Sequence, residues 1–156
     1  MSSWLGDLDW QLEGLYAVRA LVATLLGAAI GWERQHHGRD AGVRTYGAVA
    51  LGACVFSVIS AHVPGADPTR IAANIVTGMG FLGAGVIFRA GDRTLGLTTA
   101  ATLWATAAIG TAVGFGMYPL AILTAGIVFA VLAAHHLPGW GEGEGPPAKD
   151  AHDEQS

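Results

Sequence analysis

The sequence predicts an all-α membrane protein, a polytopic bundle of five transmembrane helices. Its 156 residues are 52% hydrophobic and only 13% charged, and the mean hydropathy is +0.45. This composition argues against a soluble globular protein. The charges also lie in short gaps between apolar runs of about 18 to 20 residues, the length that crosses a hydrocarbon core of about 30 Å. The five runs are 15–32, 43–63, 71–88, 98–115 and 118–137.

The charges outside these runs predict the domain organisation and the orientation. Residues 1–14 form an acidic arm, residues 15–137 the membrane domain, and residues 138–156 an acidic tail, rich in Gly and Pro, that is expected to be disordered. Arginines gather in the gaps after the first and third runs. Because basic residues favour the cytoplasmic side, the N-terminus is predicted outside and the C-terminus in the cytoplasm. The arginines of these two gaps are Arg34, Arg39, Arg44, Arg89 and Arg93.

The first, second and fifth runs carry small residues at four-residue spacing, which places them on one face of each helix. Such ridges let helices approach closely where lipid removes the hydrophobic drive between them, and they predict a tight bundle. The ridges are Ala23, Gly27 and Gly31 in the first run, Ala53, Ser57 and Ala61 in the second, and Gly126, Ala130 and Ala134 in the fifth.

The third run is the richest in glycine. At 100° per residue, Gly78 and Gly85 share one face, and Gly80 and Gly83 share the opposite face. Both faces therefore offer close contact to other helices. We expect the protein to form a homo-oligomer through them, most simply a dimer.

Polar residues open this third run. Asp67 precedes Pro68, so its plainest role is the N-cap of the third helix. Arg70 and Asn74 are one turn apart on the same face. Asn74 lies inside the span, where its amide needs a partner, and the threonines of the fourth run are the expected one.

The fourth run carries a ridge of hydroxyl groups. These hydroxyls can bond to carbonyls of their own helix, or they can form a polar stripe that faces a neighbour or a wet cavity. The sequence leaves both interpretations open. The ridge consists of Thr98, Thr102 and Thr106, with Thr99 beside it, and continues at the same four-residue spacing through Gly110 and Gly114.

Charged residues meet where the first run ends and the second begins. Glu33 and Arg34 end the first run, and Arg44 and Thr45 open the second. An unpaired charge so near hydrocarbon costs on the order of a few kcal/mol, so Glu33 is expected to pair with Arg34, Arg39 or Arg44. Two interpretations remain. The cluster is either an ion-pair clasp that fixes the helix ends or a cytoplasmic site for a cation or a partner.

Other kinds of site find no support in the sequence. It has no nucleophile with an adjacent base, no phosphate loop and no zinc-ligand spacing. His36 and His37 are adjacent, so their rings point apart rather than onto one metal. The basic residues are too few and too scattered for a nucleic-acid surface. We therefore expect a protein that is not an enzyme and does not bind nucleic acid.

Three long motifs run through the apolar segments, namely GWERQHHGRDAGVRTYGAVALGACVFSVIS, DPTRIAANIVTGMGFLGAGVIFR and GLTTAATLWATAAIG. Together they resemble the MgtC/SapB family of bacterial inner-membrane proteins over residues 15–137. The resemblance implies a helical domain of the bacterial inner membrane associated with magnesium homeostasis, growth in low magnesium and, in pathogens, survival inside macrophages. It also implies a link to the proton-driven ATP synthase, which some members are reported to restrain.

The motif positions of this family fall on charged, polar and small residues of the chain. The departures from its pattern are Thr98, where the best-known virulence-linked members have asparagine, and Asn74, where many have glutamine. The chain resembles the short form of the family, which lacks the C-terminal soluble domain. The positions carried over are Glu33, Arg34, Gly42, Arg44, Thr45, Asp67, Pro68, Arg70, Gly78, Gly80, Gly83, Gly85, Arg89, Gly96, Leu97, Thr99, Ala100, Thr102 and Trp104.

Two functional interpretations follow. In the first, the protein lies in membrane lipid and regulates another inner-membrane protein, such as the ATP synthase. In the second, it conducts Mg²⁺ or another cation, with Glu33, Asp67 and Asn74 lining the path and waters completing an octahedral shell. Glu33 and Asp67 are the candidate Mg²⁺ ligands, and the sequence points to no other cofactor. None of the five runs has an Asp or Glu near its centre, which favours the regulator.

Overall fold

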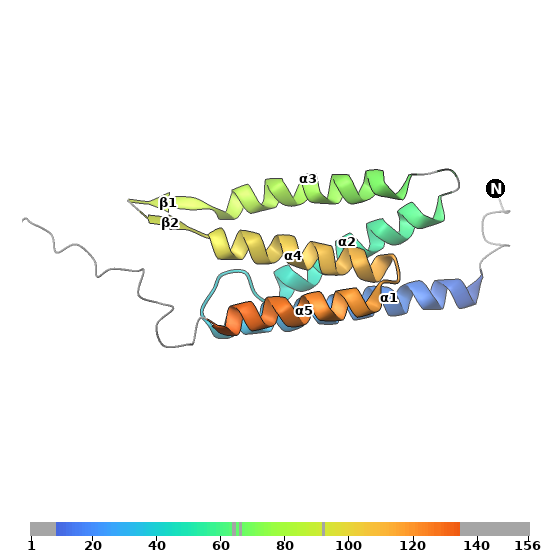
Figure 1. The fold of residues 1–156 in the computed structure, drawn as a ribbon, viewed down its shortest axis with the longest axis horizontal. Helices are drawn as coiled ribbons and strands as arrows, with labels where there is room; N and C mark the ends of the chain where they lie inside the picture. The colour runs from blue at the N-terminus through green and yellow to red at the C-terminus, as the bar shows by residue number, and fades with distance from the viewer. Residues whose placement is uncertain (1–8, 64, 66, 92, 135–156) are drawn as a thin grey trace, which may run out of the picture.

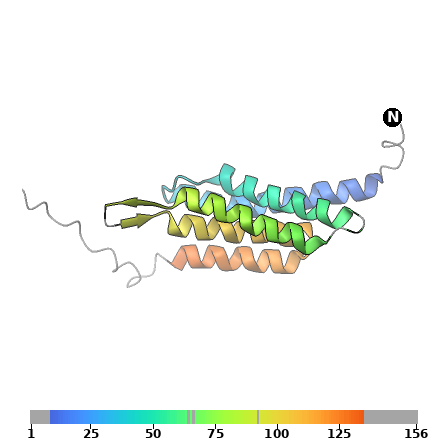
Figure 2. The same ribbon diagram turned by 90° about the horizontal axis from the view of Figure 1, so that it is seen from above.

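The computed structural model describes residues 9–63, 65, 67–91 and 93–134 and has five helices and two short strands there. The helices lie side by side as an elongated bundle, and consecutive helices run in opposite directions (Figures 1 and 2). This arrangement confirms the predicted all-α membrane bundle. The elements are α1 (Trp10–His36), α2 (Val43–His62), α3 (Pro68–Val86), β1 (Phe88–Ala90), β2 (Arg93–Leu95), α4 (Leu97–Gly114) and α5 (Tyr118–Ala133).

Three helices, α1, α2 and α4, are long and apolar enough to cross a membrane. α5 is apolar but spans 16 residues in the described part, and α3, which carries Arg70 and Asn74, is not among the three. The predicted fifth run extends to residue 137, and its residues beyond 134 lie outside the described part. The same holds for the predicted tail at 138–156 and for residues 1–8 of the predicted arm.

α1 begins at Trp10, five residues before the predicted run at 15. The carboxylate of Asp9 is the physical reason, because its Oδ1 accepts hydrogen bonds from the backbone N–H groups of Gln11 (3.0 Å) and Leu12 (3.4 Å). This N-cap satisfies donors that the first turn of a helix leaves unpaired. Residues 10–14 of the predicted arm are therefore part of the first helix.

A β-hairpin that the sequence pattern did not predict joins α3 to α4 (Figure 1). As a result, the third helix ends at Val86 rather than at the predicted Phe88. Gly91 (φ +62°) and Gly96 (φ +86°) have left-handed backbone conformations, and a Cβ at Gly96 would collide with the carbonyl of Val86. Both positions therefore require glycine. The antiparallel register pairs Phe88 with Leu95, Arg89 with Thr94, and Ala90 with Arg93.

The core forms where α1, α2 and α4 meet, and α4 contacts all four other helices. Glycine brings the backbones of these helices together. A Cβ added at Gly27 would lie 2.5 Å from the carbonyl oxygen of Tyr46, and one at Gly31 would lie 2.7 Å from that of Gly42. A Cβ at Gly110 would overlap the carbonyl oxygen of Ala50. The predicted small-residue ridge of the first run is thus confirmed as a contact with α2.

The glycines of α3 behave differently. A Cβ at Gly83 would lie in ordinary contact, 3.6 Å from that of Ala100 in α4. Gly78, Gly80 and Gly85 face open space within one chain. Their predicted role in oligomer contacts stays a prediction. Trp104, carried over as a packing residue, is 52% exposed and borders a groove between α3, α4 and α5.

The loop between α1 and α2, the hairpin and the last turn of α5 lie at one end of the bundle (Figure 1). The start of α1 and the loop between α2 and α3 lie at the other. Both arginine-bearing gaps therefore share one end, which we call the arginine end.

Candidate functional site: a buried polar cluster

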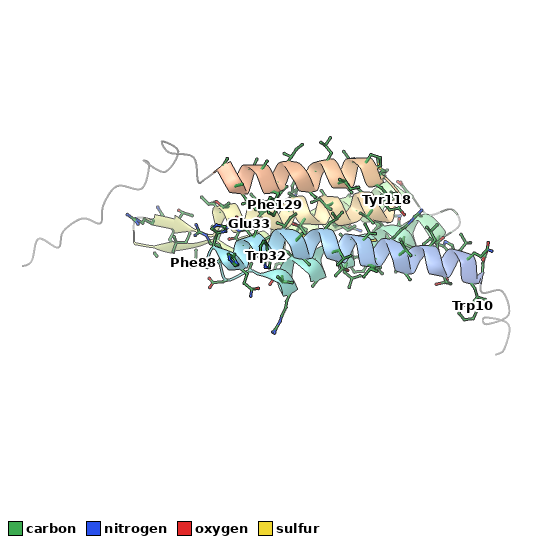
Figure 3. All side chains as sticks on the ribbon, turned by 90° about the horizontal axis from the view of Figure 1, so that it is seen from below. Trp10, Trp32, Glu33, Phe88, Tyr118 and Phe129 are labelled. Atoms are coloured by element: carbon green, nitrogen blue, oxygen red, sulfur yellow. The ribbon has the colours of Figure 1, made fainter. Side chains whose placement is uncertain are left out.

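Two charged side chains are buried near the arginine end. Glu33 and Arg34 lie in the last turns of α1, and each is only 6% exposed. In Figure 3, Glu33 lies towards the hairpin and its Phe88, whereas Tyr118 and Trp10 lie towards the opposite end. Burying both charges is costly unless each is paired or hydrogen-bonded. Their surroundings therefore decide what this site can do.

Glu33 binds a histidine rather than the predicted arginine. Its Oε1 lies 3.0 Å from Nδ1 of His37, one turn further along, and the same ring nitrogen lies 2.7 Å from the backbone oxygen of Glu33. Within the described part of the chain, no arginine forms an ion pair with Glu33, and Arg39 and Arg44 are exposed. The expected arginine clasp is therefore wrong. His37 follows Glu33 by four residues, so the two side chains lie on the same side of α1 and the histidine is the nearer partner.

Arg34 faces the interior and connects the cluster to α2 and α4. The Arg34 guanidinium and the Glu33 carboxylate both lie near enough to the hydroxyl of Tyr46 to act on it electrostatically. Tyr46 is fully buried, and its hydroxyl lies 2.5 Å from Oγ1 of Thr102. We call Glu33, Arg34, Tyr46 and Thr102 the polar cluster.

The threonines of α4 use both of the arrangements that the sequence left open. Thr102 donates to the carbonyl of Thr98 (2.8 Å), with that of Thr99 at 3.1 Å, and Thr106 donates to the carbonyl of Thr102 (2.8 Å). Because the Thr102 proton points into its own helix, Tyr46 is the donor in the bond between the two hydroxyls. The threonine hydroxyls thus bond to carbonyls of their own helix, and Thr102 also joins α4 to α2 through Tyr46.

Two atoms of the polar cluster have no hydrogen-bond partner among the described residues. They are Oε2 of Glu33 and Nε of Arg34, and both are buried. A buried carboxylate oxygen without a donor costs free energy, because water solvates it in the unfolded chain. Oε2 of Glu33 is therefore left to accept a hydrogen bond from a group that the described residues do not supply.

Several predicted site residues lie outside this cluster. Arg44, Thr45, Arg89 and Thr98 are exposed at the arginine end, and Thr99 is half-buried there. Arg70 is exposed in the first turn of α3, at the opposite end. The structure therefore brings together Glu33, Arg34 and Thr102 of the predicted set.

Asp67 is the N-cap of α3, as predicted, at the end of the bundle opposite Glu33 (Figure 1). Its Oδ1 accepts from the backbone N–H (2.9 Å) and the hydroxyl (2.7 Å) of Thr69. These bonds, with a smaller contribution from Arg70, lower the pKa of the Asp67 carboxyl below its ordinary value. Glu33 and Asp67 cannot ligate one ion, and the described residues contain no group of three His, Cys, Asp or Glu side chains that could hold a metal.

Asn74 does not meet the threonines of α4. Its side chain is exposed and borders a groove between α2 and α3, and no hydrogen bond joins it to another described residue. The expectation failed because residues that face α4, such as Met79 and Gly83, lie on another side of α3.

The sequence interpretation also missed Arg19. This half-buried arginine of α1 donates from Nη1 to the carbonyl of Gly114 (2.8 Å) and from Nε to the hydroxyl of Tyr118 (3.2 Å). It therefore ties α1 to the carboxyl end of α4, where the helix dipole favours a cation. An arginine inside an apolar run was the signal that could have identified it.

Known proteins resemble most of this chain. The profile of the MgtC family matches residues 20–137. Protein MgtC of Brucella abortus is 51% identical over 112 residues, which are 71% of this chain and 47% of the relative. Protein MgtC of Salmonella choleraesuis is 48% identical over 137 residues, 83% of this chain and 59% of the relative. "Putative magnesium transporter YhiD" of Escherichia coli K12 is 42% identical over 131 residues, 78% of this chain and 60% of the relative.

The chain thus spans about half to three-fifths of the length of these curated relatives. No solved structure matches it. The family match covers the helices that build the polar cluster, from within α1 to the end of α5. This membrane protein belongs to the MgtC family.

Proposed function

We propose that this chain is an inner-membrane regulator that supports magnesium homeostasis and growth at low magnesium. In this proposal it acts by contacting another membrane protein, such as the ATP synthase, and performs no enzymatic chemistry. The magnesium role rests on the family and on the Escherichia coli relative, which is named for magnesium transport. The mode of action rests on the shape of the bundle.

The filled interior of the bundle is the observation that carries the regulatory proposal. Backbone contacts at Gly27, Gly31 and Gly110 close the space between α1, α2 and α4. A cavity of about 580 Å³ lies instead at the side of the bundle, as a groove between α2 and α3, and its lining is apolar except for Asn74. A second lateral groove, of about 250 Å³, lies between α3, α4 and α5. Apolar lateral grooves fit neighbouring helices better than they fit a hydrated ion.

Cation transport is the second candidate, and Glu33 favours it. A buried carboxylate oxygen without a hydrogen-bond partner is the kind of group that a transporter uses to bind an ion or a proton. In this alternative, the polar cluster is the cation site near the arginine end.

Reconstitution separates the two functions. Liposomes that contain only this protein are expected to take up Mg²⁺ no faster than protein-free liposomes, while the same chain restores growth of a host that needs it at low magnesium. Inverted vesicles that contain the chain are expected to show slower proton-driven ATP synthesis than vesicles without it. Mg²⁺ uptake that is lost in Glu33→Gln would reject the regulator in favour of the transporter. Unchanged ATP synthesis would remove the ATP synthase as the partner.

We also propose that the arginine end faces the cytoplasm and that the N-terminus lies outside. Single cysteines at Arg39 and Arg93, introduced into Cys54→Ser, should resist a membrane-impermeant thiol reagent in intact cells. A cysteine at Gly65, in the loop between α2 and α3, should react. All three positions are exposed, so burial does not explain a difference between them. Reaction at position 39 from outside would invert the topology.

A further inference from the structure

α3 is only lightly enclosed by the other helices of the bundle. Of the α3 side chains that the structure describes, only Met79 and Gly83 are buried. Grooves flank it on both sides, one shared with α2 and the other with α4 and α5. Figure 2 shows α3 lying over the rest of the bundle rather than within it. Much of its circumference is therefore free for another contact.

The free surface of α3 carries a heptad pattern. Residues spaced alternately by three and four positions form a seam that stays on one side of a helix in a left-handed coiled coil. In the single chain, the first of these residues is half-buried and the other four are exposed. We call this row the α3 seam; it consists of Ile71, Asn74, Gly78, Phe81 and Gly85.

Asn74 makes it unfavourable for the α3 seam to face lipid. It lies six residues from the start of α3, about 9 Å along the helix axis. Its amide has no hydrogen-bond partner in the described part of the chain, and hydrocarbon offers none. An amide has both a donor and an acceptor, so it is complementary to a second asparagine. Two copies in one membrane have parallel α3 helices, and a two-fold axis between them brings the two Asn74 side chains opposite each other.

The remaining seam residues alternate in size in a way that suits the same pairing. A side chain added at Gly78 or Gly85 would meet nothing within 4 Å, so both positions can receive a neighbour. Phe81 lies between them and is 82% exposed. In parallel pairing, the aromatic ring of one copy packs beside the glycines of the other, as a knob fits a hole. The groove beside the seam, lined by Gly52 and Gly78, extends this surface towards α2.

We propose that two copies of this chain pair in parallel along the α3 seam, with the two Asn74 amides hydrogen-bonded across the interface and fixing its register. A polar residue at one seam position is known to set register and partner number in this geometry. The regulatory function proposed above does not require this pairing. The groove between α3, α4 and α5 lies off the seam and stays open to another membrane protein, so failure of the pairing would leave the regulatory proposal standing.

Disulfide scanning in native membranes tests the seam directly. Single cysteines in Cys54→Ser at Ile71, Asn74 and Phe81 should form disulfide-linked dimers on mild oxidation. Cysteines at Val76, Gly80 and Ala84, which are exposed on the same helix off the seam, should not. Crosslinking at the second set, at neither set, or to a product unlike twice the mass of the chain would overturn the proposal.

The contribution of Asn74 is measured on the unoxidised protein. Asn74→Leu should weaken dimerisation in detergent or bilayers by about threefold to thirtyfold, the range for one interhelical hydrogen bond in a membrane. Asn74→Gln should retain most of it, because the amide remains. Thr77→Val is the matched control, since Thr77 bonds to the carbonyl of Ala73 in its own helix and lies off the seam. An unchanged dimer in Asn74→Leu, with abundance and melting as in wild type, would reject the register role.

Discussion

Replacing Gly110 by leucine is expected to prevent stable folding of the bundle. A Cβ at this position would overlap the backbone carbonyl of Ala50 in α2, and backbone cannot move aside as a flexible side chain can. α2 and α4 would have to separate, which also strains the bond between Tyr46 and Thr102. Overpacking a fitted contact costs about 1 to 3 kcal/mol and more where relaxation is blocked, so we expect a loss of about 3 kcal/mol or more.

Membrane abundance and thermal unfolding in detergent measure this effect. Gly126→Leu is the matched control, because Gly126 is also a helical glycine of an apolar run but has no neighbour within 4 Å. The control should reach the membrane at wild-type levels. If both variants melt at the same temperature, the close contact between α2 and α4 is wrong.

The second large effect is expected for Arg34→Met. Methionine keeps much of the side-chain volume but removes the positive charge beside Glu33, leaving a buried carboxylate with His37 alone. Removing one member of a buried charged pair costs about 3 to 5 kcal/mol. We expect a change near the lower limit, because Glu33 and Arg34 form no direct ion pair. Arg44→Met, at an exposed position, should change stability by about 0.5 kcal/mol or less.

The double variant Glu33→Gln with Arg34→Met tests what the charges are for. Neutralising both buried groups removes the unpaired charge and should restore much of the stability lost in Arg34→Met. Unfolding in detergent gives the stability, and complementation at low magnesium gives the function. A stable double variant that still supports growth would assign the polar cluster to structure alone. No loss of stability in Arg34→Met would show that the two charges do not depend on each other.

The number and order of the helices could be predicted because each apolar run has the length of a membrane span. The position of Glu33, Arg34 and Thr102 inside the bundle could be predicted as well, because polar groups near hydrocarbon must find partners there. The partner of Glu33 was not predictable in the same way. Three arginines were equally plausible partners in the sequence, whereas in the fold Nδ1 of His37, the C-cap of α1, lies 3.0 Å from Oε1 of Glu33.

Tyr46 and the hairpin were missed for different reasons. The apolar residues of α2 and α4 are spread around each helix, so no amphipathic pattern shows which side of either helix faces the other, and Tyr46 gave no sign that it bonds to Thr102. The strands β1 and β2 have three residues each, too few for an alternation of polar and apolar residues to be recognised. Gly91 and Gly96 were the remaining local signals of that turn.

The hairpin between α3 and α4 constrains how α3 can move. Its ladder pairs Arg89 with Thr94, and a shift of one residue would exchange the two faces of the strands and break every pair. Sliding of α3 along the bundle axis is therefore resisted at this junction. Sideways tilting meets less resistance, because grooves lie on both flanks of α3. We therefore expect the hairpin to fix the position of α3 along the bundle axis more firmly than its tilt.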